Sequence, residues 1–177
     1  HLYHGEEIVD NYNWLRDKDN PETIAYLEAE NAYTGQVMAH TEELQETLYR
    51  EMRGRIKETD LSVPIKIDDY YYYSRTEQDK QYSINCRRHG SMEAPEEILL
   101  DENQLAEGLE YCEVGAYQIS PDHNLLAFSL DTEGAEIYQL RIKDLRTGDL
   151  LPDRIENVDD AAWATDNNTL FYTTLNS

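Results

Sequence analysis

Basic residues are scarce in this 177-residue sequence, where 15 Lys and Arg stand against 37 Asp and Glu for a formal net charge of −22. Nucleic acids and anionic membrane surfaces are bound by clustered cations, so neither is expected as a partner. Only two cysteines occur, Cys86 and Cys112, which is too few for a disulfide framework and favours two free thiols in a cytoplasmic protein. No apolar run approaches the ~20 residues that cross a bilayer.

Several chemical signatures are missing as well. There is no Gly-x-Ser-x-Gly nucleophile elbow, so no catalytic residue is expected in this chain, and Ser91 after Gly90 reads as part of a hairpin-like loop. Cys86 and His89 have Cys-x-x-His spacing but lack a second pair, so neither a metal site nor a cofactor is expected. The chain begins at His1 with no apolar leader and no Met, which predicts an excised or processed piece.

The first part of the sequence, residues 1–62, carries no strand signals and predicts a helical segment. Asn20-Pro21-Glu22 is typical of a helix start, which predicts a helix over 21–39. Thr41-Glu42-Glu43 predicts a second start. One face of this second helix is apolar every four residues, at Leu44, Leu48, Met52 and Ile56. Both helices therefore need another surface against which to bury their apolar side chains.

Residues 63–177 predict a mainly β domain of short strands separated by Gly, Asp and Asn turns. Fourteen tyrosines suit half-buried pleated surfaces. The expected strands are Val63–Ser74, Gln81–Arg88, Glu97–Leu100, Ala116–Ser120, Leu125–Leu130, Ile137–Lys143, Asp149–Ile155, Ala161–Ala164 and Thr169–Leu175.

An internal repeat appears when the sequence is shifted by 44 residues. Residues 117–128 then lie over 161–172, with Asp122 opposite Asp166 and Leu126 opposite Leu170. A four-stranded unit every 40–50 residues is typical of β-propeller blades, although tandem hairpins could match by chance. A propeller closes with about four to eight blades, and this chain holds about two and a half. It is therefore expected to be a fragment, or to have its open edges covered by something else.

Acidic residues are concentrated in residues 89–140, which contain no Lys or Arg. The stretch is either a solvated acidic face or a negative field that attracts basic peptides. The loop at residues 131–136 holds three acids in six residues between two inner strands. We expect Glu133 and Glu136 to contact a basic substrate or a neighbouring domain, with a plain solvated loop as the alternative.

Several stretches together resemble the prolyl oligopeptidase family of serine peptidases, and within it the oligopeptidase B branch. The similarity extends over essentially the whole chain. It includes Val9 to Asp17, Tyr26 to Thr34, Cys86-Arg87-Arg88, Ser120-Pro121-Asp122 and Leu151 to Glu156. The segments Trp14-Leu15-Arg16-Asp17 and Ala29-Glu30-Asn31-Ala32-Tyr33-Thr34 are specific as a pair.

This resemblance implies the fold and the activity. In the family a seven-bladed β-propeller caps a C-terminal α/β-hydrolase domain that holds the Ser, Asp and His, and a leading helical segment packs on that domain. This chain would supply the helices and the first two to three blades of an enzyme that cuts short peptides after Arg or Lys. It would be inactive by itself and could self-associate through its open edges. The alternatives are a stand-alone acidic β-repeat module for a basic partner and an unrelated repeat domain with no ligand.

Overall fold

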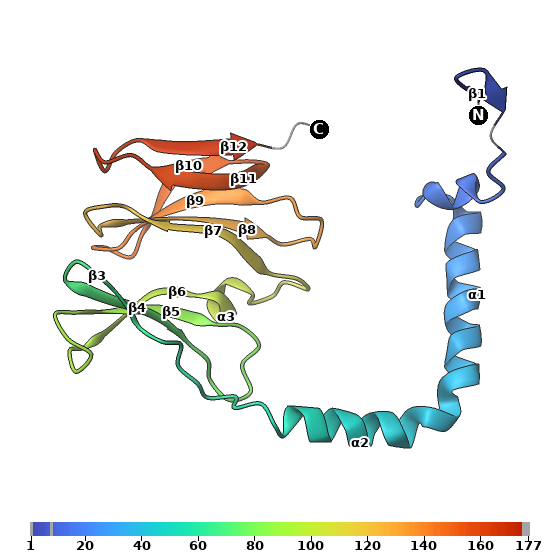
Figure 1. Ribbon diagram of the computed structural model, residues 1–177, viewed down its shortest axis with the longest axis horizontal. Coiled ribbons are helices and arrows are strands. Elements are labelled where there is room, and N and C mark those ends of the chain that lie inside the picture. Colours follow the sequence, from blue (N-terminus) through green and yellow to red (C-terminus); the bar gives the residue numbers. More distant parts are fainter. Residues whose placement is uncertain (1, 8, 175–177) are drawn as a thin grey trace. The chain divides into compact units, whose positions relative to one another are not determined.

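The chain divides into two compact units in a computed structural model that describes residues 2–7 and 9–174. The helical unit comprises residues 1–56 and the propeller unit comprises residues 57–177. Each is described by itself below (Figure 1). No helix in the described ranges combines the length and the apolar character needed to span a bilayer.

The helical unit contains a small hairpin that the sequence did not predict. Strands β1 (Leu2–Tyr3) and β2 (Glu6–Glu7) pair antiparallel. Gly5, at φ +88°, lies in the turn between them, where a left-handed residue lets the chain reverse within two positions. The expectation that residues 1–62 lack strands is therefore wrong at this point.

The long helix α1 (Pro21–Met38) begins where the sequence predicted. The Asn20 side chain accepts a hydrogen bond from the Glu22 backbone N–H at 2.9 Å, and Pro21 occupies the first turn. A 3₁₀ turn, η1 (Asn13–Arg16), precedes it. Thr23 is buried against that turn and donates to the Trp14 carbonyl at 3.2 Å, while the Trp14 and Tyr26 rings meet edge to face.

The second helix, α2 (Glu42–Arg53), begins where the sequence predicted, although the Thr41 side chain does not cap it. A 3₁₀ turn, η2 (Ala39–Thr41), connects α1 to α2, and the Thr41 hydroxyl donates backward to the Met38 carbonyl at 2.7 Å. The Thr41 side chain therefore bonds to a backbone carbonyl at the end of α1 rather than to a backbone N–H at the start of α2.

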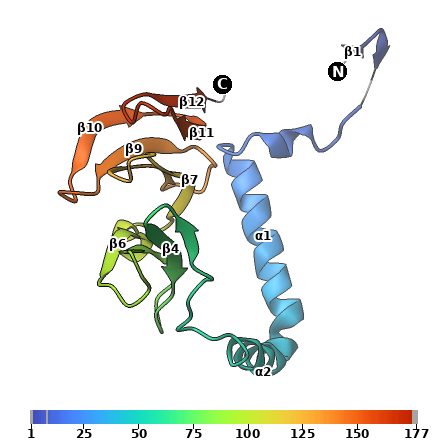
Figure 2. The same cartoon turned by 60° about the vertical axis from the view of Figure 1, so that its left-hand side comes forward.

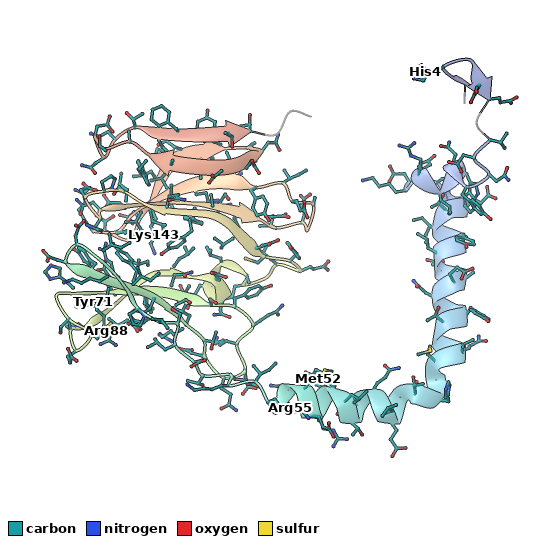
Figure 3. The ribbon with its side chains drawn as sticks, in the orientation of Figure 1. His4, Met52, Arg55, Tyr71, Arg88 and Lys143 are labelled. Carbon is teal, nitrogen blue, oxygen red and sulfur yellow. The ribbon has the colours of Figure 1, made fainter. Side chains whose placement is uncertain are left out.

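The apolar side chains of the two helices are largely uncovered within the described chain. Met52, labelled in Figure 3, is 60% exposed and Leu48 is 46% exposed. The other exposed large apolar residues of α1 and α2 are Ile24, Tyr26, Leu27, Tyr33, Val37, Met38, Leu44 and Tyr49. The helical unit thus has almost no core of its own, and tertiary contact is what normally stabilises such helices.

The propeller unit is built from antiparallel four-stranded sheets, each a simple meander (Figures 1 and 2). Blade 1 contains β3 (Ile65–Ile67), β4 (Tyr70–Arg75), β5 (Ile84–His89) and β6 (Glu96–Asp101). Blade 2 contains β7 (Glu113–Ile119), β8 (Leu125–Asp131), β9 (Gln139–Asp144) and β10 (Leu150–Ile155). A third blade begins with β11 (Val158–Trp163) and β12 (Leu170–Thr174), and β11 lies beside β7.

Two features of blade 1 differ from the sequence prediction. The expected single strand Val63–Ser74 is a tight hairpin of β3 and β4, which turns at Asp68 with φ +50°. A short helix, α3 (Glu102–Leu105), follows β6 and was not predicted. The side chain of Asp101 caps it by accepting from the Asn103 N–H at 3.0 Å.

The 44-residue repeat is confirmed in the turns that join the first two strands of each blade. Ser120 N–H donates to the Leu125 carbonyl, and Ala164 N–H donates to the Thr169 carbonyl, both at 2.8 Å. The third residue of each turn is left-handed, at φ +63° for His123 and φ +64° for Asn167. The same local sequence therefore builds the same turn twice.

The apolar core lies between successive blades. Strand β8 contributes side chains to both interfaces of blade 2, one with blade 1 and one with blade 3. Leu126 and Phe128 pack with Leu99 of blade 1, whereas Ala127 packs with Val158 and Ala161 of blade 3. Successive side chains of a strand point to opposite faces of the sheet, so one central strand serves two interfaces. Burial continues along β8 from Leu126 to Asp131.

Candidate functional site

The acidic loop between β8 and β9 lies at one defined edge of the blades. Antiparallel order places this loop at the same edge of blade 2 as the start of β7 and the end of β10. In blade 1, the chain arrives from residue 57 at the corresponding edge. There Thr76 donates its hydroxyl hydrogen to the Glu58 carbonyl at 2.6 Å and Ser62 N–H donates to the Ser74 carbonyl at 2.9 Å.

Asp131, the last residue of β8, organises this loop from inside. Its side chain is only 1% exposed, and its carboxylate accepts three backbone hydrogen bonds. The donors are the N–H groups of Glu133 at 2.8 Å, Gly134 at 3.1 Å and Glu136 at 2.8 Å. These bonds, led by the one from Glu133, hold the pKa of Asp131 below its usual value. Of the three acids in the loop, Asp131 therefore has a structural role, since its carboxylate already accepts three backbone hydrogen bonds.

The loop is also fixed by its backbone shape and by an aromatic neighbour. Gly134 and Glu136 are both left-handed, at φ +74° and φ +57°. A side chain built on Gly134 would meet the Tyr111 ring at 3.5 Å, so this ring lies directly beside the loop backbone. The Tyr111 hydroxyl donates to Glu113, and that bond raises the pKa of Tyr111 to about 12.

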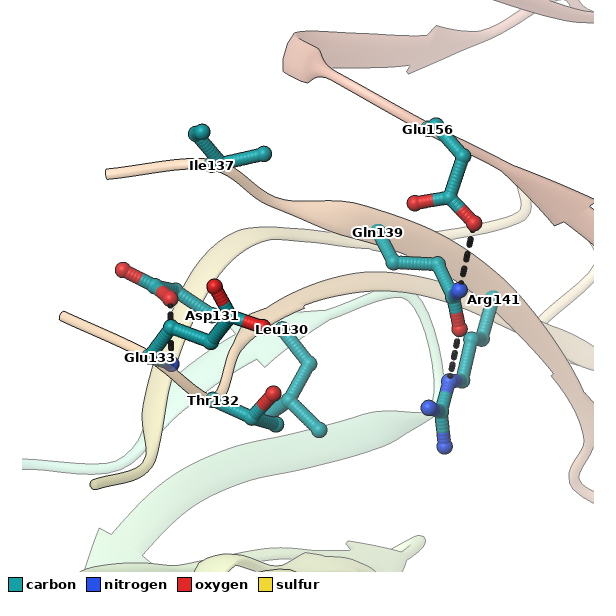
Figure 4. Close-up of a pocket in the computed structure, with 8 residues that line it drawn as sticks. All are labelled: Leu130, Asp131, Thr132, Glu133, Ile137, Gln139, Arg141 and Glu156. Atoms are coloured by element: carbon teal, nitrogen blue, oxygen red, sulfur yellow. Dashed lines mark hydrogen bonds between the residues drawn. The ribbon is translucent and has the colours of Figure 1, made fainter. Parts of the chain in front are cut away.

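A pocket of about 210 Å³ opens beside the loop (Figure 4). Arg141 Nε donates to Gln139 Oε1 at 2.9 Å, and Gln139 Nε2 donates to Glu156 Oε1 at 2.6 Å. The lining residues are Leu130, Asp131, Thr132, Glu133, Ile137, Gln139, Arg141 and Glu156. The carboxylates of Asp131, Glu133 and Glu156 line this pocket together with one cationic side chain, Arg141.

Glu133 and Glu136 are both exposed on this loop. Across residues 2–7 and 9–174 the structure places no Lys, Arg or His within ion-pair distance of either carboxylate. Their charge is therefore not neutralised locally and is available to a cation. The arrangement can attract and orient a basic group, but it contains no nucleophile and no base positioned to activate one.

The other chemistry-bearing residues considered from the sequence lie elsewhere. Ser91 lies in the β5–β6 connection, where its hydroxyl accepts from the Glu93 N–H at 3.3 Å. Cys86 is buried in β5, and burial raises its thiol pKa to about 11. His89 is three residues further along the strand, packs on Tyr70 and so lies on the opposite face of the sheet. Cys86 and Cys112 are both free thiols.

A polar cluster between blades 1 and 2 was not anticipated from the sequence. Buried Arg87 of β5 donates to both carboxylate oxygens of Glu97 at 2.8 Å and to the His123 carbonyl at 2.5 Å. The His123 ring contacts the Tyr72 hydroxyl at 2.7 Å through Nδ1. We call this the seam cluster, and its members are Tyr70, Tyr72, Arg87, Glu97 and His123.

Lys143 strengthens the same seam from β9. It donates to the Leu99 carbonyl of blade 1 at 2.9 Å and lies between the two sheets in Figure 3. Burial lowers the pKa of Lys143. The signal that could have revealed this seam is the presence of cations at strand positions that alternate with buried apolar residues.

Tandem four-stranded antiparallel meanders that pack face to face define a β-propeller type of domain. The chain belongs to the prolyl oligopeptidase family, because the family model described as "Prolyl oligopeptidase, N-terminal beta-propeller domain" matches residues 1–177. The resemblance noted in the sequence is thereby confirmed, and the alternative of an unrelated repeat domain is wrong.

Two curated relatives cover almost the whole chain. Dipeptidyl aminopeptidase BI of Pseudoxanthomonas mexicana is 42% identical over 96% of the chain, and Protease 2 of Moraxella lacunata is 38% identical over 99% of it. Each match covers 26% of the relative, so the chain spans about a quarter of their length.

Among solved structures, oligopeptidase B from Leishmania major superposes with a TM-score of 0.86 at 33% identity. That match covers 94% of this chain and 24% of the other. Oligopeptidase B from Trypanosoma brucei, in a closed form with covalently bound antipain, gives a TM-score of 0.85 at 34% identity and covers 96% of this chain and 24% of the other. The prediction of propeller blades after a helical segment is confirmed.

Proposed function

We propose that this chain is the N-terminal part of a serine oligopeptidase that hydrolyses short peptides after Arg or Lys. The observation that carries the proposal is the likeness to oligopeptidase B, at 33% identity and a TM-score of 0.86 over 94% of the chain. In the complete enzyme the Ser of a C-terminal α/β-hydrolase domain attacks the scissile carbonyl, its His acts as general base and its Asp orients the His.

The chain's own contribution is structural and electrostatic. The exposed apolar faces of α1 and α2 pack on the hydrolase domain, and the blades restrict which peptides enter. Without the nucleophile, the 177-residue chain by itself is inactive. The cytoplasmic location predicted from the two unpaired cysteines stays a prediction.

Glu133 and Glu136 serve this function at the edge of blade 2 that carries the β8–β9 loop. That edge is the one at which the chain enters blade 1 from the helical unit, so it is the edge at which a hydrolase domain is expected. Their unneutralised charges would meet a basic peptide or a cation across the domain interface.

Replacing both glutamates with glutamine in the complete enzyme should lower kcat/KM for Arg-containing peptides by about two- to fivefold at low ionic strength, because exposed charge pairs contribute about 0–1 kcal/mol. The loss should shrink as salt rises, since salt screens exposed charges. Initial rates on a fluorogenic Arg peptide at two salt concentrations measure this.

The matched control removes two exposed acids that lie outside the acidic loop, Asp149 in the β9–β10 turn and Asp153 within β10, by substitution with Asn. The net charge changes equally, so a local effect should leave this control close to the parent enzyme. An equal loss in both double variants, or no loss in either, would contradict a role for Glu133 and Glu136.

A second candidate activity is the release of dipeptides from peptide N-termini, favoured by the 42% identity to dipeptidyl aminopeptidase BI. Such an enzyme must recognise a free α-amino group, which is also a cation that the acidic loop could bind. Peptides with blocked N-termini separate the two activities, because an endopeptidase cleaves them and an enzyme that requires the free amine does not.

A further inference from the structure

The first turn of blade 3 reaches back to the first turn of blade 2. Asn167, in the turn between β11 and β12, accepts a hydrogen bond through its side-chain Oδ1 from the backbone N–H of Asp122 at 2.9 Å. Asp122 lies in the turn between β7 and β8. One side chain therefore joins two turns of successive blades directly.

Blade 2 makes an equivalent contact with blade 1. His123 occupies the same turn position as Asn167, and its ring Nε2 lies 3.1 Å from the carboxylate of Asp68. Asp68 lies in the turn between β3 and β4, which is the first turn of blade 1. In both cases the partner is an aspartate of the preceding blade's first turn. It is contacted at its carboxylate in blade 1 and at its backbone N–H in blade 2.

The backbone conformation at these positions makes their polar side chains informative. His123 and Asn167 are both left-handed, at φ +63° and φ +64°. Glycine adopts this conformation without steric cost, but it has no side chain with which to contact another blade. Asn and His are among the few other residues that tolerate it. Their presence at both positions fits a role in the contact between blades.

A second bond accompanies each of these contacts. Trp163 of blade 3 donates through Nε1 to the Gln118 carbonyl of blade 2 at 3.0 Å, and Arg87 of blade 1 donates to the His123 carbonyl. The side chain of the left-handed residue is therefore one of two links at each interface. Its removal should loosen the turns while the blades stay packed.

We infer that the third residue of the first turn is a latch that fixes each blade to the one before it, and that blade 3 offers the backbone N–H of Asp166 to the same residue of a fourth blade. Asp166 is opposite Asp122 in the 44-residue repeat and is exposed in this chain. The expected partner is a side-chain hydrogen-bond acceptor from Asn, Asp or His. The inference takes from the proposed function only that the chain is part of a longer propeller.

Asn167→Gly in the complete protein tests the latch, because glycine keeps the left-handed backbone and removes only the side chain. We expect hydrogen exchange at the Asp122 amide to become about fivefold faster, as for the loss of one hydrogen bond. Exchange measured by mass spectrometry over residues 120–124 reports this change. His123→Gly should in the same way speed exchange over residues 67–70 of blade 1.

Asn168→Ala is the matched control for an effect confined to the turn of blade 3. Asn168 is adjacent to the latch, and its side chain donates to the Asp166 carbonyl at 3.2 Å, within its own turn. Its loss should change exchange over residues 164–169 and leave residues 120–124 as in the parent protein. Unchanged exchange over 120–124 in Asn167→Gly, or an equal increase in Asn168→Ala, would overturn the latch.

The fourth blade provides an independent test. Its first turn should follow that of blade 3 by about 40–50 residues in the complete sequence, and its third residue should be Asn, Asp or His. Substituting that residue with Gly should speed exchange at the Asp166 amide. Glycine or an apolar residue at that position would contradict the inference. These measurements do not use peptidase activity, so an inactive complete protein would overturn the proposed function and leave the latch standing.

Discussion

Substituting Arg87 with Met should lower the free energy of unfolding of the propeller unit by about 3 kcal/mol, the lower end of the cost of breaking a buried ion pair from one side. The methionine retains an apolar stem of similar length, so the loss isolates the guanidinium. Glu97 is 42% exposed and can be partly rehydrated, which is why the lower end applies. Chemical denaturation followed by tyrosine fluorescence measures the change.

The size of the effect follows from what the guanidinium touches. It binds both oxygens of Glu97, donates to the His123 carbonyl and lies 4.4 Å from the centre of the Tyr70 ring. Glu97 and Tyr70 belong to blade 1, whereas His123 belongs to the first turn of blade 2. Loss of Arg87 therefore weakens one blade and separates it from the next.

Two controls bracket this prediction. Arg87→Lys keeps the charge but loses the two-pronged geometry, so it should fall between the parent and Arg87→Met. Arg146→Met removes a largely exposed partner of Asp144 and should leave the unfolding midpoint nearly unchanged. Equal stability of Arg87→Met and the parent protein would show that the seam cluster does not hold the blades together.

Leu48→Ala should destabilise two forms of the protein to very different extents. In the complete enzyme it should cost about 2–5 kcal/mol, the usual loss for a fully buried leucine. In the 177-residue chain, where Leu48 is 46% exposed, the change should stay within about 0.5 kcal/mol, as for an ordinary surface position. The difference arises because only the complete enzyme contains the surface that covers α2.

Glu46→Ala, two positions away on the same helix, is the control for a general effect on α2. It should be mild in both forms, since Glu46 makes an exposed pair with Arg50. Thermal unfolding of both variants and of the parent protein, in each of the two forms, gives the comparison. A small cost of Leu48→Ala in the complete enzyme would show that the apolar face of α2 remains solvated there.

Local signals in the sequence were sufficient to predict the blades. The turns at Ser120 and Ala164 could be predicted because each is formed by bonds within six residues, and the 44-residue shift places them over one another. The hairpin of β3 and β4 was missed because its turn, Asp68-Asp69, is shorter and lies directly before four tyrosines that all favour strand. The start of α2 at Glu42 was predicted, but not that the Thr41 hydroxyl would donate to the Met38 carbonyl at the end of α1.

The candidate site was only partly predictable for a different reason. A count of charges could find the acidic loop but treated Asp131, Glu133 and Glu136 alike. Which acid turns inward depends on the end of β8 being buried by neighbouring blades. The seam cluster lies further beyond sequence reasoning, because Arg87 and His123 are 36 residues apart and meet only when two sheets stack.

The specificity of the complete enzyme toward peptides with blocked N-termini tests the central claim most directly. The measurement is kcat/KM on matched fluorogenic peptides with Arg, Lys or Pro before the scissile bond, with the 177-residue chain as the inactive control. We predict a preference for Arg and Lys over Pro of at least about 100-fold, typical of a site built to pair a charged group. Preferred cleavage after Pro, or no cleavage unless the N-terminus is free, would contradict the assignment.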